Sequence, residues 1–208
     1  GDRPQDIDWR QSAKTQNIYI RQKEWQISQK TFFWASSAEG MFFSSDKSLP
    51  QKADVARVII LALALLMSRA DEHVGYFGNS KTGRSDGKIQ QIAQKLLDAD
   101  DVRESLPDVQ GFSVPTNASL VLAGDFLDPL GDIEGCFRFL SATVENALVL
   151  QVLDPQELEL NYDGRVIFQA PDGGHKEMVN HVASVRQSYR SRIQAHIQDI
   201  FEICSNSN

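Results

Sequence analysis

Apolar runs recur along the chain and predict its strands. Four of them cover residues 31–35, 73–78, 119–123 and 147–153. They are rich in aromatic, β-branched and leucine side chains and are bounded by glycine, proline or polar residues, as strands are. Because three of the four are almost continuously apolar rather than alternating, we predict strands that are buried on both faces of a mostly parallel sheet.

Between these runs the apolar residues recur every three or four positions, which predicts helices. The predicted helices span residues 52–69, 88–97, 133–144 and 176–203, and Asp132 is placed to cap the third. Asp163 and Gly164 separate two short apolar pieces at 158–160 and 166–168, which indicates a small β-hairpin before the long final helix.

Strands that alternate with helices predict an α/β fold of the doubly wound, three-layer type. Residues 1–30 are more polar and turn-rich, and we interpret them as an N-terminal extension that packs on the core. Residues 31–208 then form the α/β domain. In such folds ligands bind at the carboxyl ends of the strands, so the loops at 36–48, 78–87 and 124–132 are the candidate site.

Composition narrows the classes of partner. The 208 residues carry a net charge of −7, which argues against a nucleic acid or an anionic membrane as the partner. The longest apolar run, residues 58–67, is far shorter than the ~20 residues that span a bilayer, so we expect a buried helix there. Cys136 and Cys204 are the two cysteines, and we expect free thiols in a reducing, cytoplasmic compartment.

Oxygen-bearing side chains gather in the three candidate loops. Ser36 follows the first core strand, Thr82 lies in the loop after residues 76–77, and Asp125 and Asp128 follow the third strand. Oxygen ligands with carboxylate charge are what Mg²⁺ binds. This layout resembles that of von Willebrand A-type domains, which hold a divalent cation through an Asp-x-Ser-x-Ser loop, a Thr and an Asp.

The opening block allows a closer comparison. Asp2, Asp8, Trp9 and Arg10, followed by the Ser-Ala-Lys at 12–14, resemble the signature of the bacterial domain-of-unknown-function 58 family, proteobacterial type. Further blocks match in the same order up to the Tyr-Asp-Gly at 162–164. The resemblance implies a von Willebrand A-like fold, and it implies a core fragment, because typical members have residues before and after this segment.

The metal loop departs from the family pattern. An alignment that ends on Met41 places Ser36 at the Asp position, Ala38 at the first Ser and Gly40 at the second. One hydroxyl replaces a carboxylate and two hydroxyls, and Asp125 with Thr82 adds little to such a cage. We therefore expect no stable metal and no cofactor, with a degenerate site whose edge is kept for partner binding.

Three other features have competing interpretations. The charged residues around Trp9 are either a binding cluster or, as we favour, a structural network. Ser36 and Ser37 lack the Gly-x-Ser-x-Gly elbow and an activating His that a nucleophile needs. Phe42 and Phe43 form either an exposed contact patch or, more commonly for such residues, part of the core.

The resemblance implies a non-enzymatic protein-interaction or adaptor module. Genes of this family often lie beside MoxR-type AAA ATPases and other von Willebrand A proteins, so a protein of either kind is the expected partner. The alternative is a divalent-metal-dependent binding domain or hydrolase-like enzyme that uses Asp125, Asp128 and Glu39. A third hypothesis is a scaffold subunit that associates through the final helix.

Overall fold

The computed structural model describes residues 29–79, 81–99, 103–109, 115, 117–170 and 174–206. The predicted N-terminal extension, with Asp2, Asp8, Trp9 and Arg10, lies almost wholly outside these residues. The strands are β1 (Lys30–Ala35), β2 (His73–Tyr76), β3 (Ala118–Gly124), β4 (Asn146–Gln151), β5 (Val166–Gln169) and β6 (Lys176–Val179). The helices are η2 (Glu39–Phe42, a 3₁₀ helix), α2 (Lys52–Arg69), α3 (Asp86–Asp98), α4 (Leu130–Ser141), α5 (Pro155–Glu159) and α6 (Val182–Asn206).

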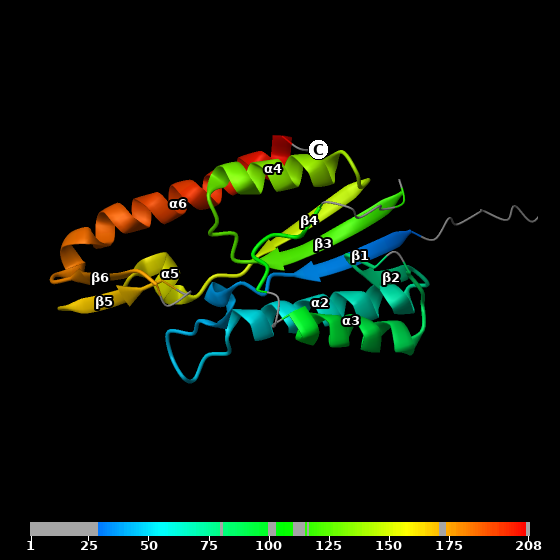
Figure 1. The fold of residues 1–208 in the computed structure, drawn as a ribbon, viewed down its shortest axis with the longest axis horizontal. Coiled ribbons are helices and arrows are strands. Elements are labelled where there is room, and N and C mark those ends of the chain that lie inside the picture. The colour runs from blue at the N-terminus through cyan, green and yellow to red at the C-terminus, as the bar shows by residue number, and fades with distance from the viewer. Residues whose placement is uncertain are drawn as a thin grey trace, which may run out of the picture.

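Four strands form a parallel sheet in the order β2-β1-β3-β4, and β5 and β6 form a separate antiparallel hairpin. The predicted α/β fold with a mostly parallel sheet, a small hairpin and a long C-terminal helix is therefore confirmed. Parallel strands end at the same edge, and in Figure 1 the arrowheads of β1 and β3 point left, toward α5 and the hairpin. The segments that follow β1, β3 and β4 consequently meet there.

Helices cover both faces of the sheet (Figure 1). The helices α2 and α3 pack on one face, and α4 with α6 lies on the other. Adjacent residues of β1 pack on opposite faces of the sheet, since successive side chains of a strand point in opposite directions. Phe32 and Trp34 belong to the core under α4 and α6, whereas Phe33 and Ala35 belong to the core under α2.

The last strand of the sheet differs from the prediction. We expected residues 147–153 to be buried on both faces, but β4 is the edge strand and its first three residues are exposed. Leu148, for example, is 48% exposed. An apolar run of this length is compatible with either position, because the pattern does not tell which strands lie beside it.

The C-terminal region differs from the predicted elements in two places. Residues 158–160 were expected to be a strand, but residues 155–159 form the short helix α5, which begins after Asp154. The predicted helix at 176–203 starts only at Val182, because residues 176–179 form β6 and pair with β5. The predicted cap of α4 is also wrong, since Asp132 lies in the first turn and the N-cap residue is Pro129.

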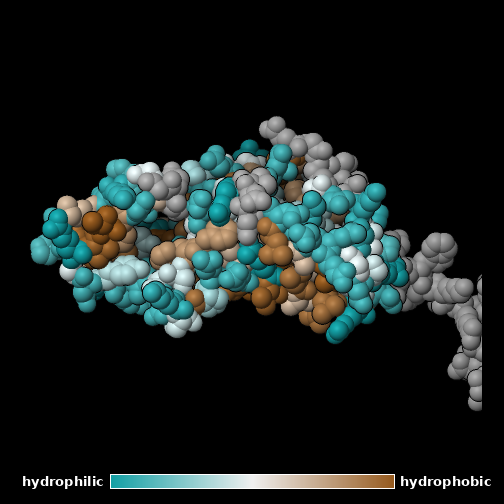
Figure 2. All heavy atoms as spheres, turned by 60° about the horizontal axis from the view of Figure 1, so that its bottom comes forward, coloured by the Kyte–Doolittle hydropathy of each residue, from teal (hydrophilic) through white to brown (hydrophobic). Residues whose placement is uncertain are grey.

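One face of α2 is exposed although its sequence predicts burial on most sides. Val58 is 67% exposed and Leu66 is 62% exposed, and Figure 2 shows hydrophobic atoms gathered on the side of the molecule that α2 and α3 form. None of the helices in the described part of the chain has the length and apolar character that crossing a bilayer requires.

Candidate functional site

Ser36 lies beside Gly124, the residue before Asp125, at the carboxyl edge of the sheet. Their strands are in register, with Ala35 opposite Ala123, and the Ser36 N–H donates to the Ala123 carbonyl over 2.7 Å. A Cβ on Gly124 would lie 3.0 Å from the Ser36 Cβ, so glycine allows the two loops to approach closely. The strand order thus brings together the residues after β1 and β3.

The first residue of α2 places a charge at this edge. Lys52 is 3% exposed, and its Nζ lies 2.9 Å from Asp125 Oδ2 and 2.6 Å from Glu157 Oε1. A lysine is almost never buried unless it is paired, and a cation at a helix N-terminus also opposes the helix dipole. The two carboxylates compensate both costs. We call Lys52, Asp125 and Glu157 the buried ion cluster.

The N-terminus of α5 fixes the Glu157 carboxylate. Its Oε2 accepts from the Asp154 N–H over 2.8 Å, and the Asp154 carboxylate in turn accepts from the Gln156 N–H over 2.8 Å. This reciprocal pattern is a capping box. Asp154 Oδ2 also accepts from the Ser45 N–H over 3.0 Å, so α5 is bound to the loop before α2.

Opposing influences set the pKa of Asp154. Burial, the largest single influence, raises the pKa of this carboxyl group, but hydrogen bonds from Ser45 and Gln156 together with the charge of Lys52 lower it. The combined effect leaves the pKa of Asp154 below its ordinary value, so the group is ionised at neutral pH.

The serines after β1 serve the local backbone. Ser36 Oγ donates to the Glu104 carbonyl over 3.2 Å and accepts from the Ala38 N–H over 3.3 Å. Ser37 Oγ accepts from the Glu104 N–H over 3.0 Å. Both serines are buried, so their hydroxyls fasten this loop to residues 103–105 and do not face solvent. Gly40 lies in η2.

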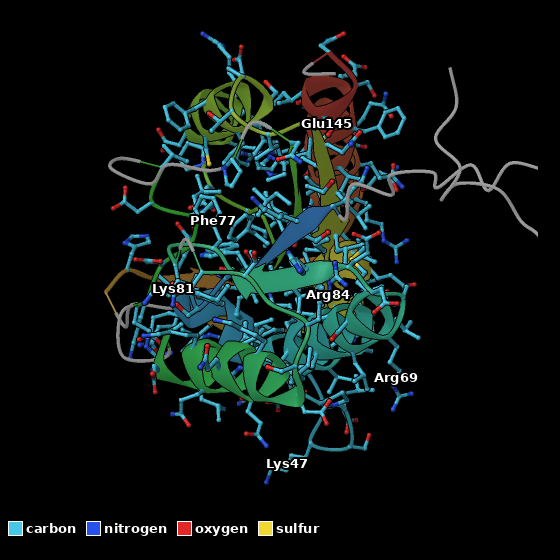
Figure 3. The ribbon with its side chains drawn as sticks, turned by 90° about the vertical axis from the view of Figure 1, so that its right-hand side faces the viewer. Lys47, Arg69, Phe77, Lys81, Arg84 and Glu145 are labelled. Atoms are coloured by element: carbon cyan, nitrogen blue, oxygen red, sulfur yellow. The ribbon has the colours of Figure 1, made fainter. Side chains whose placement is uncertain are left out.

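The predicted site residue Thr82 lies away from Ser36. Gly83 pairs with Val74 of β2, and a Cβ on Gly75 would lie 3.0 Å from Thr82 Cγ2, so Thr82 runs alongside the middle of β2. Figure 3 shows Lys81 and Arg84, on either side of Thr82, along this strand. Gly75 is opposite Phe32 in β1. Phe32 precedes Ser36 by four residues, so Thr82 is offset from Ser36 by roughly 13 Å along the strand direction.

Asp128 and Glu39 have different surroundings from Asp125. Asp128 lies near Cys136 of α4: burial raises the pKa of that thiol to about 11, and the charge of Asp128 adds to the shift. Glu39 lies 3.5 Å from the Arg103 guanidinium. The three carboxylates proposed for the alternative enzyme therefore have separate neighbours: Lys52, Cys136 and Arg103.

The donor set does not fit a divalent cation. A Mg²⁺ ion binds carboxylate oxygens at about 2.0–2.1 Å, so an ion on Asp125 would lie beside the Lys52 ammonium, which is 2.9 Å from the same carboxylate. In the part of the chain that the structure describes, no group of three or more His, Cys, Asp or Glu residues is arranged to hold a metal. The hydroxyl of Ser36 is also engaged elsewhere.

A groove opens beside the buried ion cluster. Its volume is about 680 Å³, and it lies between η2 and the unit formed by α5, the hairpin and the start of α6. Glu157 contributes to its wall. Aromatic side chains form much of the rest of its lining: Phe42, Phe43, Tyr162, Phe168 and Tyr189. The remaining lining residues are the apolar Leu160, Val166 and Ile167, together with Glu39, Gly40, Gln156 and Gln169. We call it the aromatic groove.

The two phenylalanines that the sequence left open take different positions. Phe43 is 38% exposed, so this residue departs from the expected burial. Phe42 is partly buried, and the guanidinium carbon of Arg103 lies 4.3 Å from its ring centroid. A cation over an aromatic face is a stabilising contact, and here it packs against a ring that lines the groove.

Sequence reasoning missed Lys52 and Glu157 as members of the site. We placed Lys52 only as the start of a helix and assigned the region after Asp154 to a strand and turn. The available signal was Asp154-Pro155 followed by Glu157, a capping-box spacing with proline in the first helical turn. The Asp163-Gly164 turn signal favoured a hairpin instead, with residues 158–160 as its first strand.

Comparison with known proteins shows the family. The model of "Protein of unknown function DUF58" matches residues 1–199. One solved structure that is similar is an aerotolerance-related membrane protein from Bacteroides fragilis NCTC 9343, with multiple mutations to serines: it is 14% identical, the match covers 84% of this chain and 100% of that chain, and the TM-score is 0.42. No curated protein matches the sequence. The match over residues 1–199 shows that the chain belongs to the DUF58 family of proteins of unknown function.

Proposed function

We propose that this chain is a non-enzymatic protein-interaction module that binds an apolar segment of a partner protein in the aromatic groove. The groove carries the proposal. Its volume of about 680 Å³ lies within the range of roughly 300–1,000 Å³ typical of ligand sites. Its lining is apolar and aromatic with a few polar groups, which suits insertion of apolar side chains from a partner.

The polar groups at the adjoining sheet edge support binding rather than catalysis. The hydroxyls of Ser36 and Ser37 bond to the backbone at Glu104, and the carboxylates of Asp125 and Glu157 bond to Lys52. A nucleophile needs an adjacent base, and these groups are instead used to hold the edge together. The proposal includes a degenerate metal site, with no cofactor.

The resemblance to the family suggests the partner. We propose a MoxR-type AAA ATPase, or alternatively another von Willebrand A protein, because genes for both often lie beside members of this family. Cys136 and Cys204 are free thiols, which supports a reducing cytoplasmic compartment for this pairing.

Binding of the purified full-length protein to a purified MoxR-type ATPase from the same organism tests the proposal. The groove variant is Phe43→Ser, and the matched control is Leu97→Ser, which removes an exposed apolar side chain from α3. We expect Phe43→Ser to weaken binding by roughly tenfold or more, as for an interface anchor, and Leu97→Ser to leave it unchanged. Equal effects of the two variants would contradict the groove as the binding site, and absence of binding would contradict the partner.

A further inference from the structure

We infer that the Lys52 ammonium is a built-in cation that takes the place of a dissociable metal ion at the sheet edge, so that the edge is held closed without metal. The inference concerns the buried ion cluster alone and does not depend on the groove or on any partner. The Lys52 Nζ contacts the one carboxylate, Asp125, that remains at the edge from the expected ligand set.

Charge supports the assignment. The side chains of Asp125 and Glu157 are 8% and 17% exposed, so two carboxylates lie close together with little water. Buried carboxylates need a counter-charge to stay ionised. The ammonium supplies one charge to both, and it is attached to the chain, so its local concentration does not depend on the medium.

The connections of the cluster support the same assignment. Lys52 begins α2, Asp125 follows β3, and Glu157 belongs to α5, so one ammonium joins three elements that are far apart in the sequence. A divalent ion bound between loops joins segments in the same manner. The lysine therefore provides the cross-link that a metal would provide, and this cross-link does not depend on binding an ion from solution.

The position of the Lys52 ammonium also keeps a metal ion from binding Asp125. A second cation on Asp125 would lie beside a buried ammonium, and like charges at such distances repel strongly where the dielectric constant is low. Binding of an ion would require Lys52 to leave both carboxylates. Ala38 and Gly40 stand where the family pattern has ligand hydroxyls, so the oxygens that would coordinate an ion in place of the Lys52 ammonium are missing.

The experiment compares variants of the full-length protein with and without metal. Lys52→Met removes the ammonium but keeps a side chain of similar length. The matched control is Lys47→Met, which removes the same charge from the loop that leads into α2, where Lys47 is exposed and points outward in Figure 3. Melting temperature is measured in EDTA, in Mg²⁺ and in Mn²⁺, and Mn²⁺ binding is measured by calorimetry.

We expect the wild-type protein and Lys47→Met to melt at the same temperature in EDTA and in either metal. Lys52→Met should melt lower in EDTA and recover in part with Mn²⁺. A second pair carries Ser36→Asp, Ala38→Ser and Gly40→Ser, once with Lys52 and once with Lys52→Met. Removal of the lysine should tighten Mn²⁺ binding there by roughly tenfold or more, the scale of changes around a metal ligand set.

Three results would overturn the inference. Micromolar Mn²⁺ binding by the wild-type protein would show that the lysine does not exclude an ion, and this measurement needs no variant. Equal melting temperatures for Lys52→Met and Lys47→Met in EDTA would show that the ammonium holds nothing together. Equal Mn²⁺ affinity within the second pair would show that Lys52 and the ion do not compete.

Discussion

At the scale of single residues, Lys52 is the side chain whose removal has the clearest consequence. Removal of one partner of a buried ion pair leaves the other charge uncompensated, which typically costs about 3–5 kcal/mol. Asp125 and Glu157 would both lose their counter-charge in Lys52→Met. We expect a loss of about 3 kcal/mol or more in the free energy of unfolding, measured by urea denaturation at neutral pH.

The size of this effect has an internal control. Lys47→Met should change the free energy of unfolding by no more than about 0.5 kcal/mol, because the residue is exposed. A double variant, Lys52→Met with Asp125→Asn, should recover part of the loss, since it removes one of the stranded charges. If the double variant is less stable than Lys52→Met by the full cost of Asp125→Asn alone, the two residues do not interact.

The depressed pKa of Asp154 predicts how stability depends on pH. A carboxyl group whose pKa is lower in the folded state contributes stability above its unfolded pKa, near 3.9, and loses it as the pH falls through the folded value. Asp154→Asn keeps a residue that caps helices well but removes the charge. We expect the variant to be less stable than wild type at pH 6 and the difference to shrink below about pH 4. Urea denaturation across this range measures it, and a difference that stays constant with pH would contradict the role of the charge.

At the scale of elements, the sequence predicts the sheet better than it predicts the site. The helix at 52–69 is predicted with its observed bounds, because Pro50 precedes it and a continuous apolar run fills it. The same pattern does not show that β4 is an edge strand or that α2 has an exposed face. Both depend on which elements lie beside them, and no residue pattern within the element records that.

The candidate site also has one part that the sequence predicts and another that depends on contacts between distant elements. The arrival of Ser36 and Asp125 at the same sheet edge follows from the parallel strands alone, so the sequence predicts it. The pairing of Asp125 with Lys52 requires the N-terminus of α2 to reach the edge, and the pairing with Glu157 requires α5. The helix α5 is only five residues long, too short for a periodic pattern, and its capping box is the single local sign of it.

The alternation of β1 between two cores predicts a pattern of additivity. Phe32 and Phe33 are adjacent but pack in different clusters, whereas Phe32 and Leu120 pack in the same one. We expect Phe32→Leu and Phe33→Leu each to cost about 1–2 kcal/mol, with nearly additive effects in the double variant. Phe32→Leu with Leu120→Val should deviate from additivity by about 0.5 kcal/mol or more, measured by urea denaturation. The same deviation in both pairs would show that the faces are coupled.

At the scale of the whole molecule, the structure consists of a sheet body and a C-terminal unit that stands beyond the strand ends. The unit comprises α5, the hairpin and the first part of α6, at the left of Figure 1. The hairpin does not join the main sheet. The unit is held to the body by the buried ion cluster and by the hydrogen bond from Ser45 to Asp154. The aromatic groove lies between the unit and η2, so its shape depends on how these parts are fixed.

Two arginines of α6 hold the C-terminal unit together. Arg186 donates from Nε to the Leu160 carbonyl over 3.0 Å and from Nη2 to the Tyr162 carbonyl over 2.7 Å. Arg190 donates from Nε to the Glu159 carbonyl over 2.8 Å. These bonds satisfy the carbonyls at and beyond the end of α5, which a short helix leaves without intrahelical partners. The arginines thus bind the backbone that carries two lining residues of the groove, Leu160 and Tyr162.

Replacement of both arginines by glutamine should therefore loosen the unit while the sheet body stays intact. In Arg186→Gln/Arg190→Gln we expect faster amide hydrogen exchange at residues 156–169 and unchanged exchange in β1 and β3, because local opening follows the loss of local hydrogen bonds. The matched control is Arg138→Gln, which removes an exposed i,i+4 ion pair with Glu134 on α4 and should change neither region. Hydrogen-exchange mass spectrometry measures all three proteins. Faster exchange throughout the sheet would mean that the unit and the body open together, and the groove would then be part of one cooperative structure.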